Sequence, residues 1–175
     1  MPKVSVIIPI YNVANYIERC ACSLFEQTLD DMEFIFVDDA SPDDSIQILQ
    51  ETLSLFPQRK SQVHIIHHST NLGLTAARNS GLEMATGSFV AYCDSDDYVA
   101  SDMYKLLYEK AIQEKADVIY CDFFMIYSSH NEYYSTLNEH KDKTVFLKQY
   151  LLQGWNVLWN MIISRKLLLT NHLHS

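Results

Sequence analysis

Short apolar runs and amphipathic segments alternate along most of this chain of 175 residues. Five of the runs have the length and the β-branched content of buried strands: VSVIIPI (4–10), EFIFVDD (33–39), QVHIIHH (62–68), SFVAYCD (88–94) and DVIYCDFFMIY (117–127). Four segments with apolar residues at helical spacing separate them: 13–27, 41–56, 73–87 and 102–115. This alternation predicts an α/β fold, with a mostly parallel central sheet and helices on both of its faces.

Local signals describe two of these helices further. Ser41, Pro42 and Asp44 form the pattern of an N-cap, a first-turn proline and a capping-box acid for the second helix. Gly87 is expected to close the third helix as its C-cap. The inner face expected for that third helix is unusually small, and it consists of Leu74, Ala77, Gly81 and Met84.

The remainder of the chain has a weaker pattern. Residues 128–143 are polar and predict a loop or an edge hairpin, and residues 144–153 predict a short helix capped by Thr144. Residues 155–169 mix aromatic and apolar side chains without a clean period. No apolar stretch reaches the length of about 18 residues that a membrane-spanning helix needs.

Composition and missing motifs exclude several classes of function. The chain has 22 acidic and 13 basic residues and a net charge of -9, which disfavours a nucleic-acid partner. It has no glycine-rich dinucleotide turn, no phosphate-binding loop and no Gly-x-Ser-x-Gly elbow. The four cysteines suggest neither a zinc knuckle nor a disulfide framework, so a reducing cytoplasm fits best.

Polar residues follow the ends of four predicted strands, where parallel sheets collect their ligands. These segments are 9–12 (PIYN), 38–41 (DDAS), 67–71 (HHSTN) and 94–97 (DSDD). Carboxylates as close as Asp94, Asp96 and Asp97 repel one another, so we expect a metal ion, a basic side chain or water to offset their charge. The alternation of a strand points His67 and His68 to opposite faces, which argues against a zinc site.

Four motifs, taken together, resemble those of a known family. VSVIIPIYN, FVDDAS, NLGLTAARNSG and YCDSDD, in this order within residues 4–97, resemble the family 2 glycosyltransferases of the GT-A fold. WNVLWNMIISRKLL (155–168) resembles the acceptor-side segment of the bacterial polysaccharide branch of that family. The resemblance implies a Rossmann-like GT-A fold for nucleotide-diphospho-sugar transfer. It also implies one domain over 1–175, with a donor-binding part (1–127) and a partial acceptor-side part (128–175).

The resemblance assigns the acidic cluster to a metal and donor site. Asp94 and Asp96 fall on the family's Asp-x-Asp motif, which helps to hold the sugar nucleotide through a divalent cation, Mg²⁺ or Mn²⁺. In the family the residue matching Asp96 touches the metal, whereas the one matching Asp94 faces the ribose or the donor sugar. A solvated helix-capping turn is the alternative for both residues, and for Asp97 the two interpretations are equally open.

The resemblance assigns four further residues to donor binding. Asp39 matches the residue that accepts a hydrogen bond from uracil, which favours a UDP donor, whereas Asp38 is expected to be structural. Pro9 and Tyr11 match the base-binding strand end, and Tyr11 either places its ring against the pyrimidine or packs into the core. Arg78 either reaches the diphosphate or a uracil carbonyl, or it forms an ion pair with a neighbouring carboxylate.

The implied activity is the transfer of a sugar, expected to be a hexosyl group, from a UDP-sugar to a saccharide or lipid-linked saccharide acceptor. The resemblance implies inversion, metal dependence and a role in bacterial cell-surface polysaccharide synthesis. It places the protein in the cytoplasm or peripherally at the inner face of the cell membrane. The alternatives are a sugar-nucleotide-binding module without turnover and, from another class, a nucleotidyltransferase.

The catalytic base is the part of this chemistry that the sequence lacks. In relatives the base is an aspartate that lies beyond the acceptor-side segment, but no acidic residue follows Asp142 here. We therefore expect the base beyond Ser175 and a chain truncated at its C-terminus; the alternative is a short member that uses Glu132, Glu139 or Asp142. A truncated domain would leave the apolar surface of residues 155–169 poorly covered, which predicts homodimerisation or poor solubility.

Overall fold

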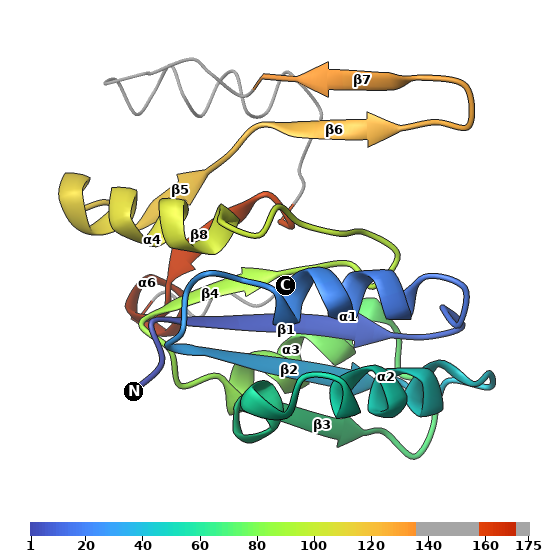
Figure 1. The fold of residues 1–175 in the computed structure, drawn as a ribbon. Coiled ribbons are helices and arrows are strands. Elements are labelled where there is room, and N and C mark those ends of the chain that lie inside the picture. The colour runs from blue at the N-terminus through green and yellow to red at the C-terminus, as the bar shows by residue number, and fades with distance from the viewer. Residues whose placement is uncertain (136–157, 171–175) are drawn as a thin grey trace.

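The computed structural model describes residues 1–135 and 158–170 (Figure 1). Its strands are β1 (Val4–Ile10), β2 (Met32–Asp38), β3 (Val63–His67), β4 (Phe89–Tyr92), β5 (Val118–Tyr120), β6 (Phe123–Ile126), β7 (Asn131–Tyr134) and β8 (Met161–Ser164). Its helices are α1 (Ile17–Phe25), α2 (Ser45–Ser54), the 3-10 helix η1 (Pro57–Gln62), α3 (Leu74–Met84), α4 (Met103–Glu114) and α6 (Arg165–Thr170).

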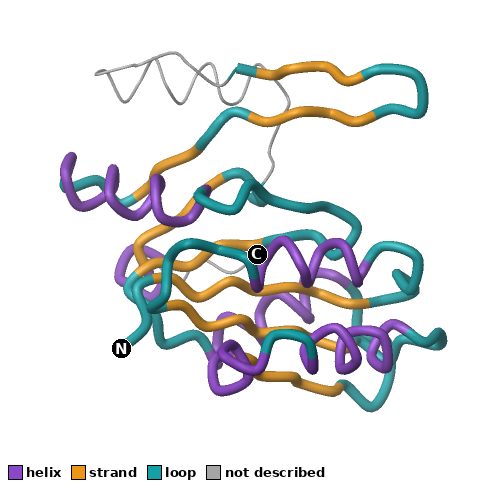
Figure 2. The backbone as a smooth tube through the Cα atoms, in the orientation of Figure 1, coloured by secondary structure: helices purple, strands orange, loops and turns teal. Residues whose placement is uncertain are grey.

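Six strands form one central sheet in the order β3-β2-β1-β4-β8-β5 (Figure 2). The strands β1 to β4 pair in parallel, whereas β8 is antiparallel to both of its neighbours, β4 and β5. The prediction of a mostly parallel sheet is therefore confirmed. The antiparallel strand β8 was not predicted, although it lies in the interior of the sheet.

Helices cover both faces of this sheet, as the sequence predicts. One hydrophobic cluster joins alternate residues of β1 and β2 to the buried faces of α1, α2 and α4. A second cluster joins the other residues of β1, β2 and β4 to α3 and α6 on the opposite face. Strand β1 is buried along its whole length, which explains its nearly continuous run of β-branched residues.

Helix α3 lies close to β1 because its inner face is small. A Cβ atom added at Gly81 would lie 2.4 Å from Cγ2 of Ile7. The helix buries Ala77, Gly81 and Leu82, whereas the predicted inner residues Leu74 and Met84 are 52% and 41% exposed. That prediction was therefore right for the centre of the face and wrong for its two ends.

The end of α3 also differs from the prediction. Ala85, and not Gly87, is the C-cap residue, and its backbone N–H donates to the carbonyls of Gly81 and Leu82. The backbone N–H of Gly87 instead donates to Oγ of Ser5 at 2.8 Å. Gly87 thus lies in the turn that leads into β4, in contact with β1.

The predicted strand 117–127 is two strands. Strand β5 ends at Tyr120, and β6 pairs with β7 in a separate antiparallel hairpin that extends beyond the central sheet (Figure 1). This hairpin confirms the hairpin alternative for the start of 128–143. The short helix predicted over 144–153, and Trp155 to Val157 of the apolar segment, lie outside the described residues. Within 1–135 and 158–170, no helix is long and apolar enough to cross a membrane.

Candidate active site

The strand order reverses at β1, and the carboxyl ends of β1 and β4 separate there. The chain runs from β1 through α1 to β2, and later returns through α3 to β4 on the other side of β1. Pairing of β1 with β4 ends at Ile7 and Tyr92, followed by one bond from the N–H of Cys93 to the carbonyl of Ile7. Pro9 is buried and has no N–H with which to continue the ladder. Parallel sheets bind their ligands at such a switch point.

The acidic turn, defined as residues Asp94–Asp97, follows β4 at this point. Asp94 is partly buried, whereas Asp96 and Asp97 are exposed, and the N–H of Asp97 donates to the carbonyl of Asp94. Although the residue as a whole is exposed, neighbouring atoms partly desolvate the carboxyl group of Asp97, and this, followed by the charges of Asp96 and Asp94, raises its pKa to about 6. Helix α4 begins only at Met103, so Asp97 does not cap it.

Two arginines from opposite faces of the sheet approach the acidic turn. Nη2 of Arg78, on α3, donates to Oδ1 of Asp94 at 2.8 Å. Nε of Arg78 is buried and has no hydrogen-bond partner in the part of the chain that the structure describes. Arg19, on α1, places its guanidinium near the carbonyl of Asp96. Basic side chains therefore offset part of the repulsion, and Arg78 keeps an N–H for a further ligand.

Asp39 directly follows β2, at the rim that the carboxyl ends of the parallel strands form. It fixes the loop that leads into α3. It is 3% exposed, and it accepts hydrogen bonds from the N–H groups of Leu72 and Gly73, both at 2.8 Å, and from Nδ1 of His68 at 2.7 Å. Burial alone raises the pKa of Asp39, but these hydrogen bonds outweigh it and lower the pKa below its usual value. The structure thus gives Asp39 a structural function, and its contact with uracil stays a prediction.

The two histidines at the end of β3, His67 and His68, make hydrogen bonds to residues at the end of β2 and on α3. Nδ1 of His67 lies 2.8 Å from Asp38, which also accepts from the N–H of Ser41. Nε2 of His68 lies 2.9 Å from Oγ of Ser80. Within the described residues, no three His, Cys, Asp or Glu side chains are placed to hold a metal ion together. The contacts of Asp38 agree with its structural interpretation, and His67 and His68 make hydrogen bonds to the loops around them.

The loop after β1 presents Tyr11 to solvent. Tyr11 is 49% exposed, so the alternative that it packs into the core is wrong. The N–H of Asn12 donates to Oγ of Ser41, and the N–H of Ala14 donates to Asp43, each at 2.8 Å. The loop is therefore tied to the segment after β2. The ring of Tyr11 remains available for a ligand at this end of the rim.

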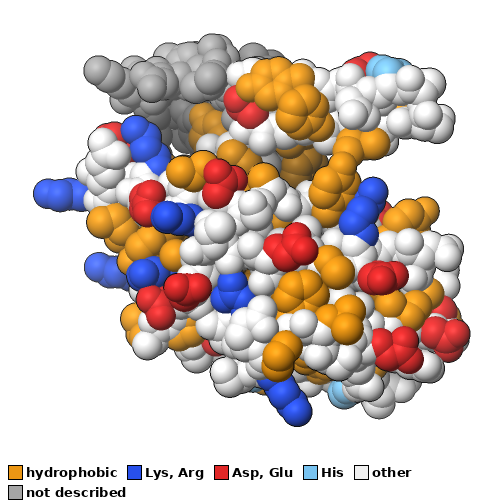
Figure 3. Space-filling view, viewed as in Figure 1, with side chains coloured by type: hydrophobic (Ala, Val, Ile, Leu, Met, Phe, Trp, Pro, Cys, Tyr) orange, Lys and Arg blue, Asp and Glu red, His pale blue; other side chains and the backbone are white. Residues whose placement is uncertain are grey.

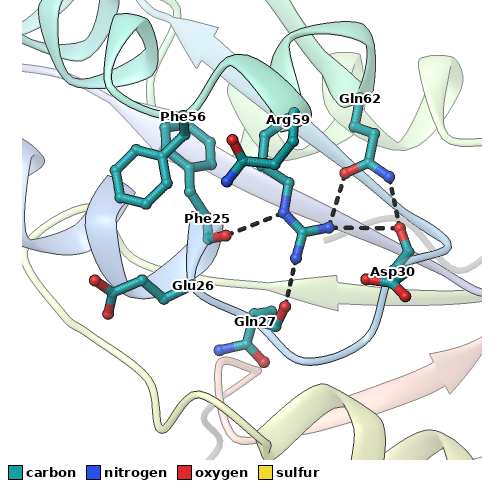
Figure 4. Close-up of a pocket in the computed structure, with 8 residues that line it drawn as sticks. Phe25, Glu26, Gln27, Asp30, Phe56, Arg59 and Gln62 are labelled. Atoms are coloured by element: carbon teal, nitrogen blue, oxygen red, sulfur yellow. Dashed lines mark hydrogen bonds between the residues drawn. The ribbon is translucent and has the colours of Figure 1, made fainter.

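A separate hollow of about 530 Å³ lies at the end of α1 (Figure 4). Its central side chain, Arg59, is 6% exposed and donates to the carbonyls of Phe25 and Gln27 and to Oε1 of Gln62. The guanidinium group is thus occupied by the protein itself. Arg59 thus joins η1 to the end of α1, and the hollow is remote in sequence from the acidic turn.

A family model described as "Glycosyl transferase family 2" matches residues 5–170. The chain belongs to this family. "Uncharacterized glycosyltransferase EpsJ" of Bacillus subtilis is 40% identical over 133 residues, which make up 76% of this chain and 37% of that protein. "Glycosyltransferase GlyA" of Streptococcus pneumoniae is 35% identical over 132 residues, which make up 75% of this chain and 18% of that protein. The chain thus spans less than half the length of these two relatives.

Two solved glycosyltransferase structures share the GT-A fold with this chain. The S. aureus TarS structure in complex with UDP-GlcNAc matches with a TM-score of 0.79 and 24% identity, over 98% of this chain and 48% of that chain. "Mannosyltransferase PcManGT from Pyrobaculum calidifontis in complex with GDP-Man and Mn2+" matches with a TM-score of 0.62 and 27% identity, over 69% of this chain and 35% of that chain. The predicted fold class is confirmed.

Three residues of this chain lie at or near the rim and were not predicted from the sequence. Arg19 is separated from the acidic turn by most of the donor-binding part, so no local pattern indicates it. Asp43, rather than the predicted Asp44, accepts hydrogen bonds at the start of α2. Asn160 directly precedes β8, and its Nδ2 donates to the carbonyl of Cys121 at 3.0 Å.

Proposed function

We propose that this family 2 glycosyltransferase binds a nucleotide-diphospho-sugar, with UDP as the nucleotide, and transfers a hexosyl group from it to a saccharide acceptor with inversion. The observation that carries the proposal is the pairing of Arg78 with Asp94, at 2.8 Å, at the switch point between β1 and β4. This pair sets a phosphate-binding cation beside carboxylates that suit a divalent metal. Both groups suit the oxygens of a diphosphate.

Asp94 and Asp96 fit a divalent cation by their chemistry. Mg²⁺ and Mn²⁺ prefer carboxylate and phosphate oxygens, and Mg²⁺ commonly takes only one or two protein carboxylates when a substrate phosphate supplies other ligands. Asp96 is exposed, so its carboxylate is free to turn toward such a group. When bound, the metal neutralises the developing charge of the leaving diphosphate. Arg78 would stabilise the same charge through its unpaired Nε.

The opposite end of the rim suits the nucleobase. Tyr11 presents a half-exposed ring beside Pro9, and the buried Asp39 lies one strand away. We propose that the ring stacks on the pyrimidine and that Asp39 orders the neighbouring loop or accepts from the imide. One TarS structure is a complex with UDP, another is a complex with UDP-GlcNAc, and PcManGT is in complex with GDP-Man, so GDP is the rival nucleotide.

The base that deprotonates the acceptor is proposed to lie beyond Ser175. Of the alternative candidates, Glu132 already accepts from the hydroxyl of Tyr134 at 2.6 Å and lies 3.1 Å from Nε2 of His130. Glu139 and Asp142 lie outside the described residues. The acceptor is proposed to be a saccharide or a lipid-linked saccharide of a bacterial surface polysaccharide, because the relatives' family transfers sugars.

Isothermal titration of the chain with UDP and with GDP, each with and without Mn²⁺, tests this proposal. We expect UDP to bind with an affinity that Mn²⁺ raises, and we expect Asp96→Asn to remove the effect of Mn²⁺. Arg78→Gln should weaken UDP binding about tenfold, because a charge-assisted hydrogen bond to phosphate is lost.

The matched control is Asp31→Asn, which removes an exposed carboxylate paired with Lys3 and should leave UDP binding unchanged. Failure of UDP to bind even with Mn²⁺ would refute the donor site. UDP binding without transfer, once a donor sugar is supplied, would favour the binding module. Release of inorganic pyrophosphate from a nucleoside triphosphate, with transfer of the nucleoside monophosphate to an acceptor, would favour a nucleotidyltransferase instead.

A further inference from the structure

An aromatic side chain stands exposed directly after the acidic turn. Tyr98 is 45% exposed, although its backbone is held on both sides. The N–H of Asp97 donates to the carbonyl of Asp94 at 3.0 Å, and the N–H of Val99 donates to Oγ of Ser23 at 3.2 Å. The exposure of Tyr98 is therefore set by an anchored backbone rather than by a free loop.

Arg19 holds the ring of Tyr98 from one side. Cζ of Arg19 lies 4.2 Å from the centre of the ring, and its Nη2 donates to the carbonyl of Asp96 at 3.5 Å. A guanidinium plane stacks well on an aromatic face, and its charge is attracted to that face. Arg19 thus covers one face of the ring, so the exposed surface of the ring lies on its other face and its edge. A ring ordered in advance loses little entropy when a ligand covers it.

The surroundings of this ring select the chemistry of a ligand. A pyranose has an apolar C–H face, which packs on an aromatic ring, and hydroxyl groups, which donate to carboxylates. The exposed carboxylate of Asp97 adjoins Tyr98. An anionic group lying on the ring itself would face the carboxylate of Asp97 with no metal ion assigned between them, and would be repelled. A neutral sugar satisfies the ring and the carboxylate together.

We propose that Tyr98, positioned by Arg19 and flanked by Asp97, forms a platform for a pyranose ring of the acceptor saccharide. The part of this inference that makes the sugar an acceptor rests on the proposed function, because only a donor bound at Asp94 and Asp96 gives that sugar a reaction partner. The platform itself is a saccharide site and stands on the geometry alone. Arg19 is a positioning residue, since it acts through the ring.

Saturation-transfer NMR of the whole 175-residue chain tests the platform. The probes are methyl β-D-glucopyranoside, methyl β-D-galactopyranoside and methyl N-acetyl-β-D-glucosaminide, each titrated with and without UDP and Mn²⁺. We expect at least one probe to bind. Tyr98→Ala should weaken it by roughly three- to tenfold, and Tyr98→Phe should retain the binding because it keeps the ring. Arg19→Gln should weaken it by a smaller factor.

The matched control is Tyr127→Ala. Tyr127 is 44% exposed and stacks on His130, so its exposure is close to that of Tyr98 and one of its faces is also covered, but it belongs to the β6–β7 hairpin. The Tyr127→Ala variant should bind the probe with unchanged affinity. Equal affinity of Tyr98→Ala and the parent chain, or no binding of any probe to a chain that binds UDP, would overturn the inference. Binding that depends on Tyr98 in a chain unable to bind UDP would support the platform and refute the donor site.

Discussion

Replacing Asp43 with asparagine tests how the loop after β1 is held beside the rim. The carboxylate of Asp43 accepts from Oγ of Ser41 at 2.6 Å, from Oγ of Ser45 at 2.5 Å, from the N–H of Ser45 at 3.2 Å and from the N–H of Ala14 at 2.8 Å. Partial burial alone would raise its pKa, but these four donors lower the pKa of Asp43 to about 2.

The magnitude follows from linkage between protonation and folding. A pKa that falls from 3.8 to about 2 on folding corresponds to about 2.4 kcal/mol, at 1.36 kcal/mol per unit. Because Asp43 is partly exposed, solvent screening reduces this, and we expect Asp43→Asn to cost about 1–2 kcal/mol at pH 7. The folded-state pKa is the lower one, so the contribution is complete above pH 3.8 and is lost as the pH falls toward 2.

Urea unfolding of the parent chain and of the variant, repeated from pH 7 down to about pH 3, measures this difference. The two stability curves should converge as the solution becomes acidic. Asp44→Asn is the control, because Asp44 is exposed and makes no side-chain cap hydrogen bond at the start of α2. A cost for Asp43→Asn that is the same at every pH, or no larger than that of Asp44→Asn, would refute the reasoning.

Three other substitutions test packing of α3 on β1, backbone strain after β2 and the separate hollow at the end of α1. Gly81→Ala places a Cβ 2.4 Å from Ile7, which costs about 1–3 kcal/mol against about 1 gained in helix propensity; urea unfolding should show a net loss, and an unchanged midpoint would contradict it. Ala40→Gly relieves a φ of 56° and should stabilise by up to about 1 kcal/mol, so a fall in Tm would count against it. Arg59→Met should cost about 2–4 kcal/mol without changing UDP affinity, whereas weakened UDP binding would make that hollow a ligand site.

Buried parallel strands were predictable because each is a short, continuous apolar run between helical segments. Strand β8 was not, because its four residues lie within a longer apolar stretch and pair with β4 and β5 only through contacts distant in sequence. The break after Tyr120 was missed for a related reason. The apolar pattern continues into β6, so the sequence carries no signal that the chain leaves the central sheet there.

The positions of the site residues were more predictable than their partners. A strand end is a local feature, so Asp39 and Asp94 could be placed at one rim from the sequence, and Arg78 could be placed on the helix between β3 and β4. Their hydrogen bonds depend on rotamers and loop paths, which the sequence does not encode locally. Asp43 and Asp44 illustrate this, because both are acids in the same turn and only the backbone path decides which of them accepts the N–H of Ser45.

The reach of Arg78 to Asp94 depends on a residue that touches neither. Gly81 lies one turn after Arg78 on α3, and its missing side chain lets the helix lie against Ile7 of β1. A helix displaced outward by a methyl group would carry the guanidinium of Arg78 away from the carboxylate with which it now makes a 2.8 Å contact. The acidic turn would then lose a cation that offsets its repulsion. The small face of α3 is therefore a determinant of the site's electrostatics as well as of its packing.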